Sequence, residues 1–167
     1  MEKLTLMLEF PQLTPSASFQ ITSQKTKAYN CVAWAAGEQN RWWWPDKMGT
    51  QYWPKDVPRE ATLAAFVAAY STLGYRECDN GDLEAGFEEV AVFTKPAGTP
   101  THAARQLPNG RWTSKLGHNE DIEHDLRGIE GRSYGQVRQF LKRPLVAAAE
   151  REDLTEVPHL SSSSVVH

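Results

Sequence analysis

Apolar positions along the 167-residue chain follow two kinds of spacing, and each predicts a different element. Near the N-terminus they alternate with other residues, which predicts a short strand over residues 4–10, ended by Pro11. Small and apolar residues over 30–40 predict a helix. A second helix is expected over 63–73, where apolar residues recur at helical spacing before Gly74.

The second half of the chain favours strands. Residues 87–95, "FEEVAVFTK", predict one strand, and "THAARQL" and "RWTSKLG" predict two more around Pro-Asn-Gly at 108–110. That tripeptide suits a type I turn closed by a glycine bulge, so Leu107 should pair with Arg111. Counting outward from this pair places His102 and Ser114 on one face of the hairpin.

The remaining segments complete the expected fold. "SYGQVRQFL", 133–141, begins with a capping serine and predicts a final helix. The tryptophan-rich and proline-rich segment 41–58 should be irregular. Helices followed by strands predict an α+β class, with helices packed on an antiparallel sheet. We expect one domain over residues 1–150 and a flexible polar tail over 151–167.

Composition and charge narrow the function classes. A formal net charge of -3 without a basic face argues against nucleic acid as a partner. No apolar run approaches the ~20 residues of a membrane helix, and the N-terminus does not resemble a cleaved signal peptide. We therefore expect a cytoplasmic protein, or one exported without a cleaved signal. Zinc spacings, calcium loops and phosphate-binding glycine loops are missing from the sequence, so we expect no metal and no cofactor.

Cys31, at the start of the first expected helix, is the candidate for chemistry. A thiol becomes a nucleophile when it loses its proton to a nearby base, and N–H groups at a helix start favour the anion. The alternative interpretation is a small buried cysteine that only packs. His102, next to the small residues Ala104 and Ser114 on its face, would leave room for its imidazole to reach a thiol. The second cysteine, Cys78, lies in a polar turn.

At these residues the chain resembles a known superfamily. "YNCVAWA" followed by "HAARQLPNGRWTSKLG" is similar to the papain-like cysteine hydrolases, above all the NlpC-type and CHAP-type amidases and peptidases. The wider pattern also resembles an uncharacterised bacterial domain family. The resemblance implies a papain-like core with Cys31 as nucleophile and His102 as general base. The residue that orients the histidine would be Asp121, with Ser114 at the matching position as the fallback; Asp121 could equally be a capping or turn residue.

The resemblance also suggests donors for an oxyanion. The backbone N–H of Cys31 is the first, and Gln24 or Asn30 could add a side-chain donor. Gln24 could equally be a solvated loop residue, and Asn30 a helix cap. The tryptophans could line a substrate cleft or pin an irregular loop against the core; those concerned are Trp43, Trp44, Trp53 and Trp112.

Two functional hypotheses follow. The first is a thiol-dependent hydrolase or acyltransferase that cleaves an amide bond through a thioester. Its substrate would be a peptide or protein, with peptidoglycan and a glutamine side chain as further options. The second is a non-catalytic protein-binding or immunity-type module that keeps the scaffold without the chemistry.

Overall fold

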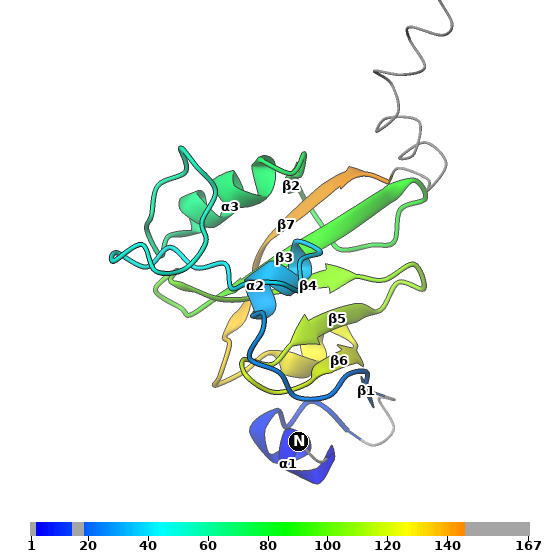
Figure 1. Ribbon diagram of the computed structural model, residues 1–167. Coiled ribbons are helices and arrows are strands. Elements are labelled where there is room, and N and C mark those ends of the chain that lie inside the picture. Colours follow the sequence, from blue (N-terminus) through cyan, green and yellow to red (C-terminus); the bar gives the residue numbers. More distant parts are fainter. Residues whose placement is uncertain (1–2, 15–18, 146–167) are drawn as a thin grey trace, which may run out of the picture.

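The computed structural model describes residues 3–14 and 19–145, and a seven-stranded antiparallel sheet dominates it (Figure 1). The strand order is β1-β6-β5-β4-β3-β7-β2, with β3 paired to both β4 and β7. The strands are β1 Gln20–Ile21, β2 Arg76–Cys78, β3 Phe87–Thr94, β4 Pro100–Gln106, β5 Trp112–Lys115, β6 Asp121–His124 and β7 Gln136–Pro144.

The helices within the described part of the chain are short. They are α1 Lys3–Glu9, α2 Cys31–Ala35, α3 Leu63–Ser71 and the 3-10 turn η2 Leu126–Ile129. The expected α+β papain-like core, with N-terminal helices packed on a sheet, is therefore wrong. The structure is sheet-dominated. Strand β7 replaces the helix expected over 133–141, and β2 and β6, which the sequence did not predict, also pair into the sheet.

Two local predictions are corrected. The strand predicted over residues 4–10 is wrong, because residues 4–9 lie in helix α1, with Leu6 buried while Leu8 is 78 % exposed. Residues four apart lie on the same face of a helix, so Leu4 and Leu8 share the face of α1 that points to solvent. The alternation of apolar residues along this segment therefore did not indicate a strand. The predicted helix over 133–141 is strand β7, held between β3 and β2. Gly135 has a φ of 75°, outside the helical region, and pairing on both sides outweighs local propensity.

Other predictions are confirmed. Helix α3 begins after Thr62, whose side chain accepts from the N–H of Ala65, and is followed by Gly74 with a φ of 91°. The hairpin closes as predicted, with the N–H of Leu107 donating to the carbonyl of Arg111. The helix expected over 30–40 is shorter than predicted. The tail expected over 151–167 lies outside the described residues.

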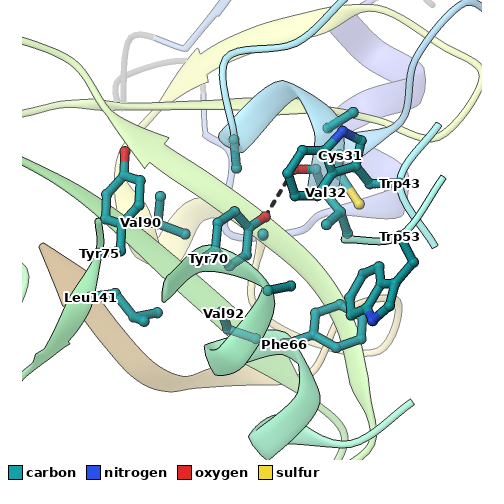
Figure 2. Packing of buried hydrophobic residues seen from close by; sticks show 14 of the residues in the cluster. Cys31, Val32, Trp43, Trp53, Phe66, Tyr70, Tyr75, Val90, Val92 and Leu141 are labelled. Atoms are coloured by element: carbon teal, nitrogen blue, oxygen red, sulfur yellow. Dashed lines mark hydrogen bonds between the residues drawn. The ribbon is translucent and has the colours of Figure 1, made fainter. Parts of the chain in front are cut away.

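The sheet carries a hydrophobic core on each face. On one face α2 and α3 pack over β3 and β4, and Figure 2 shows Tyr70 donating a hydrogen bond to the carbonyl of Val32 at 2.9 Å. On the other face α1 and the loop after it cover Phe93, Ala104 and Trp112. Successive residues of β4 therefore point into one hydrophobic core and then the other, with Ala103 on the side of α2 and Ala104 on the side of α1.

Candidate functional site

The sulfur of Cys31 lies where the ladder between β4 and β5 stops. The last residue pair of this ladder joins Arg105 to Thr113. Backbone N–H groups two residues apart point the same way, so the N–H of Ala103 points to the β5 side but has no β5 residue paired with it. Cys31 lies on this side of β4, and the backbone N–H groups of Ala103, Val32 and Cys31 itself lower the pKa of its thiol. Burial nevertheless dominates and raises the pKa of the thiol to about 11, so Cys31 rests as a neutral thiol with 8 % exposure.

Asn30 fixes the start of α2. Its Oδ1 accepts from the N–H groups of Ala33 and Trp43, both at 3.1 Å, and its Nδ2 donates to the carbonyl of Trp43 at 2.8 Å. All of these partners belong to the protein, so the side chain of Asn30 acts as a cap and loop tie. Gln24, the other suggested oxyanion donor, has an exposed side chain in the preceding loop.

His102 is fully buried on the opposite face of β4 from Ala103. Its ring stacks on Tyr134 with centroids 4.0 Å apart and meets Phe93 edge-on at 5.3 Å. Burial, followed by the nearby His124, holds the pKa of His102 well below its usual range. The imidazole is therefore neutral, and burial makes it a weaker base than a free histidine.

A buried hydrogen-bonded chain runs through Ser114. Nε2 of His102 lies 2.9 Å from Oγ of Ser114, and the same oxygen lies 2.7 Å from Nε2 of His124. Nδ1 of His124 lies 2.7 Å from the carbonyl oxygen of Asp125. Strands β4, β5 and β6 thus each contribute one side chain to a row across the sheet.

The last carbonyl in this row determines where the protons lie. A carbonyl only accepts, so Nδ1 of His124 carries the proton and its Nε2 accepts from Ser114. Ser114 must then accept from Nε2–H of His102, which leaves a lone pair on Nδ1 of His102. That nitrogen is buried and has no hydrogen-bond partner in the described part of the chain. The row therefore presents a neutral imidazole with a free basic nitrogen.

Cys31 and His102 lie on opposite faces of β4, with the backbone of that strand between them. The N–H that faces the sulfur belongs to the peptide joining His102 to Ala103. The side chains depart toward different faces, and no hydrogen bond links the thiol to the imidazole among the described residues.

Asp121 is not bonded to His102. It lies opposite Lys115 in the β5–β6 ladder, on the face of Cys31, and accepts from the hydroxyl of Tyr29 at 2.9 Å. Burial of Asp121 raises the pKa of its carboxyl group. Burial of Tyr29, followed by its hydrogen bond to Asp121, raises the pKa of the Tyr29 hydroxyl to about 12. The residue bonded to His102 is Ser114, the fallback from the sequence.

The tryptophans are divided between two places. Trp43 and Trp53 are buried in the core beside α3, and half-buried Trp44 meets Phe66 edge-on at 5.5 Å (Figure 2 shows Trp43 and Trp53). Trp112 is buried on the other face of the sheet. The four rings therefore do not line one common cleft.

Sequence reasoning missed two members of the site. His124 stands two residues after Ile122, which pairs with Ser114, so strand alternation in "DIEH" puts it on the face of Ser114. Recognising β6 would have revealed this. Tyr134 had no comparable signal, because its position depends on the long-range hydrogen bond between Thr101 Oγ1 and its carbonyl.

Residues 3–14 and 19–145 hold no cluster of three or more potential metal ligands drawn from His, Cys, Asp and Glu. Within the same residues, no helix has the length and apolarity needed to cross a membrane.

Fold and site together define a sheet-dominated domain with a buried thiol on one face of the sheet and a hydrogen-bonded histidine on the other. The chain belongs to the family described as a domain of unknown function, DUF7689, which matches residues 20–142. That range includes Cys31 and every member of the histidine row. No curated protein and no solved structure matches the chain.

Proposed function

We propose that the protein is a thiol-dependent hydrolase or acyltransferase that acts on an amide bond, with Cys31 as nucleophile and His102 as base. The observation that carries the proposal is the buried Nδ1 of His102, which has no hydrogen-bond partner among the described residues. A buried nitrogen with a free lone pair is costly unless something uses it.

The proposed reaction begins from a neutral pair. The reaction requires a rearrangement that brings the side chains of Cys31 and His102 to the same side of β4, where the S–H proton moves to Nδ1 of His102 as the sulfur attacks the amide carbonyl. The C–N bond then breaks, the imidazolium returns its proton to the leaving amine, and a thioester remains on Cys31. Water, or an amine in the case of transfer, attacks the thioester with His102 again accepting the proton, and the free thiol is restored.

The surrounding groups support each step. Ser114, held by His124, keeps Nε2 of His102 protonated and directs the base through Nδ1. The backbone N–H groups at the sulfur stabilise the thiolate as it forms. Because burial disfavours the imidazolium, protonated His102 is a strong acid toward the leaving amine, while the same burial makes the first proton transfer from Cys31 the costly step.

Alkylation of the folded protein tests the base. We compare two proteins that both carry Cys78→Ser, one of them with His102→Gln in addition. Iodoacetamide should modify Cys31 at neutral pH at least about tenfold faster in the protein that keeps His102, because general bases usually accelerate a reaction by about a hundredfold or more. Gln keeps a polar side chain of similar length while removing the basic nitrogen. Equal rates in the two proteins, or modification only after unfolding, would contradict the proposal.

A second measurement tests the covalent intermediate. p-Nitrophenyl acetate should place one acetyl group on Cys31 as a hydroxylamine-sensitive thioester, detected by mass spectrometry of the intact protein. Cys31→Ala should abolish the adduct and Cys78→Ser should preserve it. If the folded protein takes up no acetyl group at Cys31, the non-catalytic hypothesis is favoured instead.

A further inference from the structure

A cleft of about 810 Å³ lies at the far end of α2 from Cys31. It is bounded by the C-terminal ends of α2 and α3 and by the adjoining ends of β3, β4 and β7. Its volume falls within the range of small-molecule binding sites, roughly 300–1,000 Å³. Its apolar walls are Leu73, Leu83, Phe87, Leu107 and Leu145.

Two arginines line this cleft, and they differ in their partners. Arg143 is held by the protein, because its guanidinium donates to Oε1 of Glu88 at 2.8 Å and to the carbonyl of Leu73 at 2.8 Å. Arg105 lies with its guanidinium carbon 5.3 Å from the centre of the Trp34 ring, and its Nε is buried without a hydrogen-bond partner among the described residues. A buried guanidinium donor with no acceptor is costly, so Arg105, which lines the cleft, has hydrogen-bonding capacity that the described residues do not use.

The charges of the cleft indicate what that acceptor would be. Arg143 and Glu88 offset one another, and Arg105 adds one positive charge. A monoanion matches this balance, whereas a phosphate dianion would leave the cleft negative next to Glu88. A carboxylate also fits the planar fork of a guanidinium, which presents Nε and a neighbouring amino group side by side.

The apolar walls indicate the rest of the ligand. Leu83 and Leu145 are 55 % and 50 % exposed at the rim, and covering them would bury apolar surface that now faces water. We propose that this cleft binds an organic carboxylate with an apolar body, its carboxylate on Arg105 and its body on the leucines. The site is separate from the thiol chemistry and stands independently of it.

NMR titration of the ¹⁵N-labelled full chain tests this site. Octanoate should shift the indole N–H signal of Trp34 and the amide signals of Leu83 and Leu145 in a saturable way, while 1-octanol should bind at least about tenfold more weakly, as expected when a charge-assisted hydrogen bond is lost. Acetyl-Leu-Leu with a free carboxylate, compared with its amide, distinguishes a peptide C-terminus from a fatty acid as the source of the carboxylate.

Arg105→Gln should weaken binding of the preferred carboxylate by about 10- to 100-fold, because it replaces charge-assisted hydrogen bonds to the carboxylate with weaker neutral ones. Arg138→Gln, which removes an equal charge from an exposed position of β7, should leave the affinity unchanged. The amide spectrum of each variant reports its folding, and Arg105→Lys provides a second variant that keeps the charge but loses the fork. Absence of saturable shifts at millimolar carboxylate, or equal affinity of the Gln variants, would overturn the proposal.

Discussion

Oγ of Ser114 lies 2.7 Å from Nε2 of His124, and this contact fixes the protonation of a histidine two strands away. Because His124 uses its own proton on the carbonyl of Asp125, Ser114 must donate to it and accept from His102. The row leaves His102 with one basic nitrogen and holds its ring in place. Its energetic role and its proposed chemical role can be measured separately.

Removing the hydroxyl of Ser114 should destabilise the protein and reduce the reactivity of Cys31. Ser114→Ala leaves Nε2–H of His102 and Nε2 of His124 buried without partners, at a cost of roughly 2–5 kcal/mol in the free energy of unfolding. Urea denaturation measures this cost. Ser71→Ala, which removes an exposed hydroxyl on α3, should change the free energy by less than about 0.5 kcal/mol. A similar small effect for both would show that the row contributes little.

The histidine row should make the fold acid-sensitive. Burial is the main reason that the folded pKa of His124 is about 4, against 6.5 for a free histidine, with smaller effects from Asp125, Arg111 and Glu123. The unfolded chain therefore binds a proton that the folded chain does not, and stability falls as the pH drops from about 6.5 toward 4. His124 alone contributes a loss of about 3 kcal/mol across this window.

Chemical unfolding at several pH values between neutrality and about pH 4.5 measures this slope. His102 acts in the same direction, since its pKa is also lowered. His124→Gln should flatten the dependence whatever its effect on absolute stability. An unchanged slope in that variant would place the acid sensitivity elsewhere.

The loop before Cys31 should depend strongly on Asn30. Asn30→Ala removes the cap of α2 and leaves the N–H and carbonyl of Trp43 buried without their partners, so we expect a loss of about 3–6 kcal/mol. Thr62→Ala removes only the cap of α3 and should cost about 1 kcal/mol. Thermal or urea unfolding of the pair distinguishes a cap from a loop tie, and equal losses would refute the larger role for Asn30.

Gly135 should be among the least replaceable residues near the site. It has a φ of 75°, and a Cβ at this position would overlap the carbonyl of Thr94 in β3. Gly135→Ala should cost more than about 4 kcal/mol and shift Tyr134 away from His102, because backbone strain adds to a clash with backbone.

Gly37→Ala is the matched control for this prediction. Gly37 has a similar φ of 85°, yet a Cβ there would meet nothing within 4 Å. Gly37→Ala should therefore lower the free energy of unfolding by only ~1–2 kcal/mol, the cost of holding a non-glycine residue in the left-handed backbone conformation. Equal unfolding free energies for the two alanine variants would show that the clash at Gly135 is relieved without cost.

The local predictions that succeeded depended on neighbours in the chain. The turn at 108–110 specifies a hairpin register, so the shared face of His102 and Ser114 follows from counting. The strand prediction over 4–10 failed because α1 is a helix that buries Leu6 and leaves Leu4 and Leu8 exposed. The segment over 133–141 failed because β7 is stabilised by two distant partners that its own composition does not specify.

By itself, the sequence determined which residue types were available for chemistry and how the central hairpin aligns them. The tertiary structure alone decided that Cys31 would sit at the opening between β4 and β5, that Ser114 rather than Asp121 would bind His102, and that His124 would complete the row. The reason is physical. Register within a hairpin is set by a turn of a few residues, whereas the protonation and neighbours of a buried group are set by strands and loops that pack from far along the chain.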